Sequence, residues 1–150
     1  MTSMRLCRMT CWQLLRAVSC ETFARYSVLA VVVCSARKAE CRRHEHIANE
    51  SNELWFSVAS IWEIGIKVSI GKLPLPESVD EYVPTRMIQL GTNSLPISTT
   101  HALWVATLPM HHRDPFDRML ISQAQSEEMV LVSADSAFHQ YDVELLWAAQ

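Results

Sequence analysis

The part of the sequence with the densest reactive chemistry is residues 111–118, which read His-His-Arg-Asp-Pro-Phe-Asp-Arg. Asp114 before Pro115 suits a helix N-cap followed by proline at the first helical position, where the missing N–H sacrifices no hydrogen bond. Asp117 follows three residues after Asp114, so both carboxylates lie near the positive end of one predicted helix. The two acids can therefore point into the same space.

Two further acids follow predicted strands. Glu63 lies in a helix that comes directly after an apolar strand, and Asp135 comes immediately after another. In α/β proteins the functional crevice lies at the carboxyl ends of the strands, so we expect both acids to converge with Asp114 and Asp117. Several carboxylates cannot stay ionised together at low cost. A bound Mg²⁺ or Mn²⁺ would resolve the repulsion, because hard oxygen ligands favour these ions over zinc.

Each of these acids also has a purely structural interpretation. Asp114 and Asp117 fit a capping box, and Ser60 with Glu63 has the same Ser-x-x-Glu form. The side chains would then satisfy backbone N–H groups at helix starts and bind nothing else. A small α/β domain whose acids are all helix caps is therefore an alternative.

Strands and helices alternate through the second part of the chain. Apolar runs predict buried strands at 54–58, 129–133 and 143–147, and apolar residues at helical spacing predict helices opening near Ser60 and after Asp114. This order predicts an α/β fold with a mainly parallel central sheet flanked by helices.

Composition limits the class of protein. The chain has 150 residues, 49% of them hydrophobic and 19% charged, which favours one compact domain over a disordered chain. Its formal net charge of −3 excludes a basic protein that coats nucleic acid, so any nucleic-acid contact has to be local. The five cysteines are odd in number and confined to the first third, which predicts reduced thiols in a cytoplasmic protein. The apolar run at 28–34 is too short to cross a membrane.

The N-terminal third differs from the rest. Only the run at 28–33 suits a strand there, and no aspartate occurs before Asp80. Clear motifs begin near residue 47. We therefore expect an atypical segment over residues 1–46, either poorly ordered or translated from a shifted reading frame, and the α/β domain over 47–150.

Three motifs together resemble PIN-domain proteins of the VapC type, the toxin halves of bacterial toxin–antitoxin pairs. They are Glu-Leu-Trp-Phe-Ser-Val-Ala-Ser-Ile-Trp-Glu-Ile at 53–64, the block at 111–118, and Val-Ser-Ala-Asp-Ser-Ala-Phe at 132–138. The resemblance covers about residues 47–147, in the right order and spacing. It implies a PIN-like fold, a magnesium-dependent ribonuclease acting on RNA, and a cognate antitoxin that holds it inactive. It also implies a homodimer with no membrane association.

The resemblance also assigns site residues. Glu63, Asp117 and Asp135 match the catalytic, metal-binding acids, and Asp114 matches an extra acid of the Arg-Asp-Pro-Phe-Asp-Arg subgroup. The family's first strand carries an aspartate that this sequence lacks, so that strand and its acid are missing or altered. Two functions stay open: a working ribonuclease, or a catalytically impaired module that only binds antitoxin or dimerises.

The shifted-frame hypothesis makes a prediction about the gene. The codons of Met9 and Thr10 read ATG-ACN, so one shifted frame contains GAC, an aspartate codon, near the expected strand. Sequencing of the gene's 5′ end should then reveal a frame disturbance before residue 47. An undisturbed frame, supported by mass spectra of the N-terminal peptides, would remove the hypothesis.

Overall fold

The computed structural model describes residues 32–34, 53–133 and 135–147. The predicted segment 1–46 lies outside these residues except for a short strand, and so do the cysteine thiols, so the predicted boundary and thiol state remain predictions. No helix in the described ranges combines the length and hydropathy that crossing a bilayer requires.

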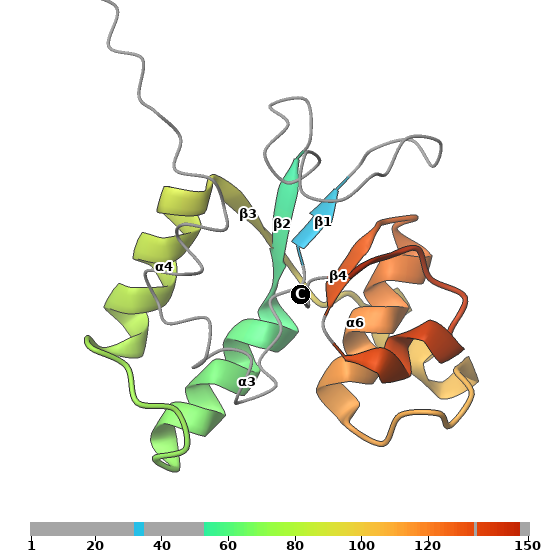
Figure 1. Cartoon of the computed structure of the whole chain (residues 1–150), viewed down its shortest axis with the longest axis horizontal. Helices are drawn as coiled ribbons and strands as arrows, with labels where there is room; N and C mark the ends of the chain where they lie inside the picture. The colour runs from blue at the N-terminus through green and yellow to red at the C-terminus, as the bar shows by residue number, and fades with distance from the viewer. Residues whose placement is uncertain (1–31, 35–52, 134, 148–150) are drawn as a thin grey trace, which may run out of the picture.

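A three-stranded sheet runs through the centre of the molecule (Figure 1). Its strands are β1 (Val32–Cys34), β2 (Leu54–Ser57) and β3 (Thr92–Leu95), in the order β1-β2-β3. β2 and β3 are parallel, with Leu54 opposite Thr92. β1 is antiparallel to β2, with Val32 opposite Phe56.

A second sheet pairs β4 (Leu131–Ser133) with β5 (Leu145–Trp147) in parallel. β4 lies against β1, the edge strand of the first sheet, so the two sheets meet at β1 and β4 (Figure 1). Of the three described strand pairs, two are parallel, which confirms the predicted α/β class. β1 overlaps the end of the run at 28–33 that was predicted as a strand, and it contains no acidic residue. The rest of that region is not described, so the loss of the family's first aspartate-bearing strand stays a prediction.

The helices cover the sheets from both sides of the molecule. They are α3 (Val58–Ser69), α4 (Val79–Leu90), α5 (Thr99–Trp104), the 3₁₀ turn η1 (Val105–Thr107), α6 (Pro115–Ser126) and the 3₁₀ turn η2 (Ser136–Gln140). α3 packs against α4 on one side and against α6 on the other. The α3–α4 contact lies within one lobe, which contains β2, α3 and α4. The α3–α6 contact joins this lobe to a second one, which contains α6, β4 and η2.

The start of α3 corrects one prediction. Ser57, the last residue of β2, is the N-cap, and its Oγ accepts a hydrogen bond of 3.0 Å from the N–H of Ala59. The expected capping box of Ser60 with Glu63 is therefore wrong. The strand runs straight into the helix, so Glu63 falls in the second turn, where backbone N–H groups already have partners within the helix.

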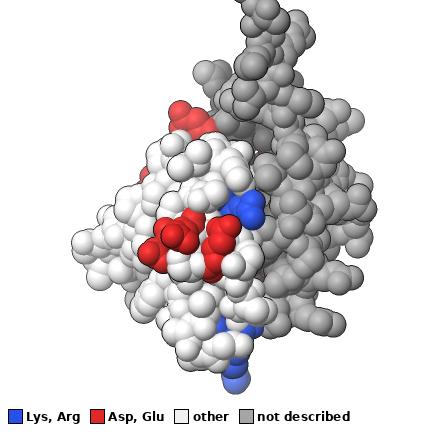
Figure 2. Space-filling view, turned by 90° about the vertical axis from the view of Figure 1, so that its left-hand side faces the viewer, with Lys and Arg blue, Asp and Glu red and all other residues white. Residues whose placement is uncertain are grey.

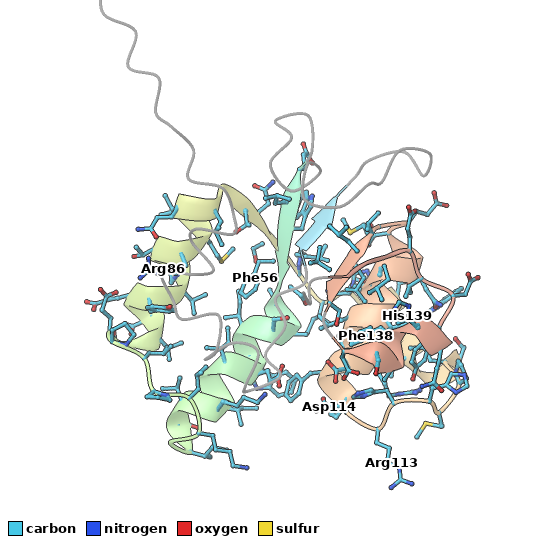
Figure 3. The ribbon with its side chains drawn as sticks, in the orientation of Figure 1. Phe56, Arg86, Arg113, Asp114, Phe138 and His139 are labelled. Atoms are coloured by element: carbon cyan, nitrogen blue, oxygen red, sulfur yellow. The ribbon has the colours of Figure 1, made fainter. Side chains whose placement is uncertain are left out.

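Two hydrophobic clusters fill the lobes. One cluster joins β2, α3 and α4 and includes Phe56, which points from β2 into that lobe (Figure 3). The other packs α6 on β4 and η2 and includes the fully buried Ile121 and Leu131. The contact between α3 and α6 lies where the two clusters meet.

A buried chain of hydrogen bonds ties this contact together. The Ser57 hydroxyl donates to Oε1 of Gln123 over 2.6 Å, and Nε2 of Gln123 donates to the carbonyl of Pro96 over 3.2 Å. Both side chains are fully buried. Their bonds link the start of α3, the middle of α6 and the end of β3. Buried amides and hydroxyls are costly without partners, so this chain favours a single arrangement of the lobes.

We expect Gln123→Leu to destabilise the protein by about 1–3 kcal/mol, because the hydrogen of the buried Ser57 hydroxyl loses its acceptor and the carbonyl of Pro96 loses its donor. Urea unfolding followed by circular dichroism measures the change. Gln89→Leu is the matched control, since Gln89 is exposed and bonds only to Arg86 among the described contacts. Equal stabilities for the two variants would contradict the assigned role of Gln123.

Candidate active site

Asp114 starts α6 as predicted. It is the N-cap, Pro115 occupies the first helical position, and its Oδ1 accepts a hydrogen bond of 2.8 Å from the N–H of Phe116. The reciprocal half of a capping box is absent among the described contacts. The N–H of Asp114 donates to Nδ1 of His112 over 3.1 Å, which leaves Asp117 out of the cap. The capping interpretation therefore holds for Asp114 and is wrong for Asp117.

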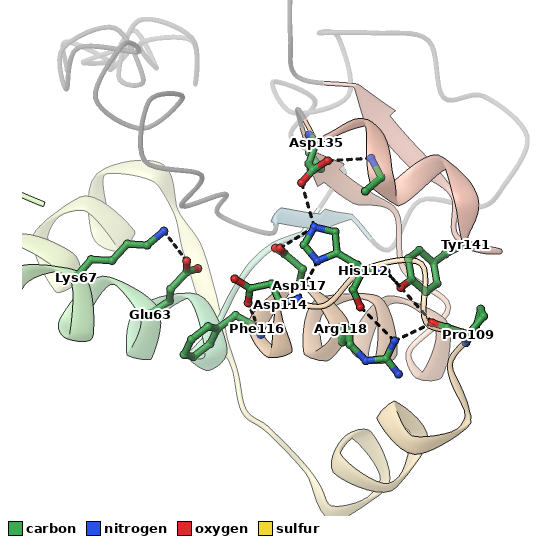
Figure 4. Close-up of polar contacts among 12 residues, drawn as sticks. Glu63, Lys67, Pro109, His112, Asp114, Phe116, Asp117, Arg118, Asp135 and Tyr141 are labelled. Atoms are coloured by element: carbon green, nitrogen blue, oxygen red, sulfur yellow. Dashed lines mark hydrogen bonds and ion pairs between the residues drawn. The ribbon is translucent and has the colours of Figure 1, made fainter. Parts of the chain in front are cut away.

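Asp117 and Asp135 meet around one imidazole (Figure 4). Nε2 of His112 lies 3.3 Å from Oδ2 of Asp117 and 3.3 Å from Oδ2 of Asp135. Asp135 comes to this place from the end of β4, where it caps η2 through a 2.8 Å bond from the N–H of Ala137 to its Oδ1. One carboxylate oxygen of Asp135 is thus used by the fold and the other faces the site.

Glu63 approaches from α3. Its carboxylate is buried and forms an ion pair of 2.6 Å with Nζ of Lys67, one turn further along the same helix. Figure 4 shows this pair on α3 beside Asp114 and Phe116 of α6. The α3–α6 contact therefore brings Glu63 toward the other acids, with Lys67 as its direct partner.

The protonation of two acids reflects their burial and their acidic neighbours. Burial raises the pKa of Glu63, the ion pair with Lys67 opposes that change, and the charge of Asp114 adds to it. The pKa of Asp117 is raised to about 7, mainly by burial. The charge of His112 opposes this change, and the charges of Asp114, Glu63 and Asp135 contribute to it. The four predicted acids thus share one electrostatic environment.

A divalent cation fits this set of donors. Ligand atoms of His112, Asp117 and Asp135 lie within 4.8 Å of one another. Carboxylate oxygens are the ligands that Mg²⁺ and Mn²⁺ prefer, and an ion would relieve the repulsion that raises the pKa of Asp117. Asp114 and Glu63 lie close enough to act on that carboxylate electrostatically. Each of them also has a structural partner.

The sequence analysis missed the residues that hold the loop before α6. Arg118 is buried, and its guanidinium donates to backbone carbonyls at distances of 2.7–3.5 Å. These carbonyls belong to Val105, Leu108, Pro109 and His112. Because its N–H groups donate to backbone carbonyls, Arg118 fixes the shape of this loop, and the loop places His112 next to the acids. The only sequence signal for this role was that an arginine directly follows Asp117 in the first turn of the helix.

Tyr141 supports the same loop from the other side. Its Oη accepts the backbone N–H of His112 over 2.7 Å and donates to the carbonyl of Pro109 over 3.2 Å. Its neighbours in the structure lie about thirty residues away in the sequence. Nothing local in the sequence pointed to this role.

One face of the described surface carries a group of acidic side chains. On the side of the molecule that carries α4, acidic side chains gather near the middle of the described surface (Figure 2). Arg113, next to the site, points away from the body of the fold (Figure 3).

Comparison with known proteins finds one matching family model and one similar curated protein. The PIN domain profile matches residues 27–144. Ribonuclease VapC16 of Mycobacterium tuberculosis (strain ATCC 25618 / H37Rv) is 49% identical over 51 residues, which cover 34% of this chain and 35% of that relative. The chain thus matches about a third of the relative's length. No solved structure matches significantly. The profile match begins within the segment 1–46 and includes β1.

The pKa of Asp117 predicts how stability depends on pH when no metal is bound. The folded state holds this proton more tightly than the unfolded chain, so stability falls as pH rises from the ordinary value of 3.8 to about 7. We expect Asp117→Asn to unfold at a higher temperature than the parent chain at about pH 8 in EDTA. The difference should shrink toward about pH 4, where the unfolded chain also holds the proton.

Thermal unfolding across this pH range measures the effect, with Asp142→Asn as a control at an exposed acid. A constant difference between Asp117→Asn and the parent chain at every pH would contradict the prediction.

Proposed function

The chain belongs to the PIN domain family, and from this premise we propose that it is a metal-dependent endoribonuclease, the toxin component of a bacterial type II toxin–antitoxin system. The observation that carries the proposal is the meeting of Asp117 and Asp135, with Asp114 and Glu63 acting on the same carboxylate. The name of the mycobacterial relative, a ribonuclease, supports the same activity. RNA is the proposed substrate, and the cytoplasm is the proposed place of action.

The proposed cofactor is Mg²⁺ or Mn²⁺, held by Asp117 and Asp135 with Asp114 and Glu63 beside them. Such an ion, when bound, activates water and neutralises the phosphate during cleavage of a phosphodiester. The protein's own part is to collect the acids in a partly buried place, where electrostatic interactions are stronger than in water. Catalytic roles are proposed for Glu63, Asp117 and Asp135.

Lys67 has a separate role in this site. It forms an ion pair of 2.6 Å with the Glu63 carboxylate, which offsets part of the charge that Glu63 brings to the acidic cluster. The charge that a bound cation has to balance therefore resides mainly on the other acids. This division suits a site in which Asp117 and Asp135 are the principal ligands.

A protein partner is the second part of the proposal. Three apolar side chains spaced four residues apart are exposed on α3 and its C-cap: Trp62 at 60%, Ile66 at 37% and the C-cap residue Ile70 at 56%. Exposed apolar side chains that form a stripe are typical of protein interaction sites. We propose that an antitoxin covers this part of α3 beside the acids, and that the chain forms a homodimer.

One observation favours the alternative of a catalytically impaired module that only binds antitoxin or dimerises. The described strand β1 carries Val-Val-Cys and no acid, whereas the resemblance implies an aspartate in the first strand. A site with one ligand fewer would bind its cation more weakly. The experiment below separates the two functions.

We expect the full chain to cut a mixed structured RNA with Mg²⁺ or Mn²⁺ and to lose that cutting in EDTA. Asp117→Asn should abolish it, because this substitution removes a charged ligand and leaves the shape of the side chain. Gel analysis of the RNA products measures the activity. Asp142→Asn should cut like the parent chain.

A folded protein that does not cut RNA with either ion would favour the impaired module over the enzyme. Cutting that survives both EDTA and Asp117→Asn would contradict the metal mechanism and point to a contaminating nuclease.

A further inference from the structure

His112 stands between the two acids that come from different elements. Its ring is only partly exposed and reaches Asp117 at the start of α6 and Asp135 after β4. Together these three side chains look like a set of metal ligands. The hydrogen bonds around the ring favour a different role.

The tautomer of the ring follows from its second nitrogen. Nδ1 of His112 lies 3.1 Å from the backbone nitrogen of Asp114, whose N–H can only donate. Nδ1 must therefore supply a lone pair, and in the neutral ring the hydrogen is on Nε2. The nitrogen that faces the acids is a donor.

A metal ligand would require the opposite arrangement. Nε2 would have to offer its lone pair to the ion, and the hydrogen would move to Nδ1, against the N–H of Asp114. That contact would bring two donors together at the N-cap of α6. His112 is thus placed to donate to the ligands and not to join them.

The donor position is well supported by the fold. The backbone N–H of His112 donates to Tyr141, its carbonyl accepts from Arg118, and its ring lies against Phe138 with centroids 6.1 Å apart. The ring is therefore held in place by hydrogen bonds to the backbone of His112, by the hydrogen bond at Nδ1 and by the contact of one face with Phe138. Such a ring can hold the two carboxylates at a set spacing.

We propose that His112 is a positioning residue, whose Nε2–H donates to Asp135 and faces the Asp117 carboxylate at 3.3 Å, and which thereby sets the spacing at which the two carboxylates receive a divalent cation. The proposal rests on the metal site of the proposed function. Each carboxylate oxygen has further lone pairs, so a shared N–H leaves coordination sites open. Partners that orient metal ligands in this way typically contribute about 10–100-fold to metal affinity.

The first experiment measures binding of Mn²⁺ alone to the full chain by calorimetry at constant pH. We expect His112→Ala to weaken binding by about 10–100-fold. His112→Gln, whose amide N–H donates at a similar reach, should restore most of that loss. His111→Ala is the matched control, because the described contacts of His111 include Tyr141 and no acid. Circular dichroism checks that each variant is folded.

Ni²⁺ separates the positioning role from ligation. An imidazole ligand would make the parent chain favour Ni²⁺ strongly, and His112→Gln would lose that preference. A positioning donor predicts that His112→Gln changes Mn²⁺ and Ni²⁺ binding by the same factor. Selective loss of Ni²⁺ binding in this variant would overturn the proposal, and so would unchanged Mn²⁺ binding in His112→Ala.

Nitrogen NMR of the ring provides a readout without metal or activity. The proposal predicts a hydrogen on Nε2 of His112 and none on Nδ1, and the reverse result would overturn it. Mn²⁺ binding that depends on His112 in a protein that cuts no RNA would support the positioning role and reject the proposed enzyme. A parent chain that binds no Mn²⁺ would reject both.

Discussion

Repulsion among carboxylates is the constraint on which the structure of the site depends. Glu63, Asp114, Asp117 and Asp135 act on one another through a partly buried space, and burial together with this repulsion raises the pKa of Asp117 to about 7. Each acid has a partner that lowers the cost of bringing them together. Lys67 pairs with Glu63, the helix start occupies Asp114, and His112 lies between the other two. The fold therefore keeps four acids together in one partly buried space.

The scaffold that imposes this repulsion is made of buried polar contacts. Ser57 and Gln123 join α3 to α6, which sets how closely Glu63 approaches Asp117. Arg118 and Tyr141 hold the preceding loop, which sets the position of His112. Such contacts are directional, and a buried donor without its partner is costly, so they select one arrangement where apolar packing alone would allow several.

The N-terminal strand β1 is part of the sheet but does not supply an acid for the proposed activity. β1 is antiparallel to β2 and carries no acid, although it stands beside β4 at the edge where the acids gather. Among the described residues, all acids of the cluster thus come from parts of the chain that follow β1. If the chain cuts RNA, either these later acids suffice or a glutamate of the N-terminal third takes the missing role. If it does not, the same cluster and the exposed stripe on α3 still suit a binding module.

Features that depend on neighbours in the chain were determined by the sequence alone. Asp114 and Pro115 predict a helix start because a cap needs only the next few residues, and alternating apolar runs predict the α/β class. The same local logic failed at Glu63, because Ser57 at the end of β2 could start the helix earlier than Ser60. The tertiary structure alone decided the direction of β1, the Ser57–Gln123 bond and the hold of Arg118 and Tyr141 on the loop. It also decided the position of His112 between Asp117 and Asp135. Each of these features brings together residues that are far apart in the sequence, and the sequence contains no information on the distance between them.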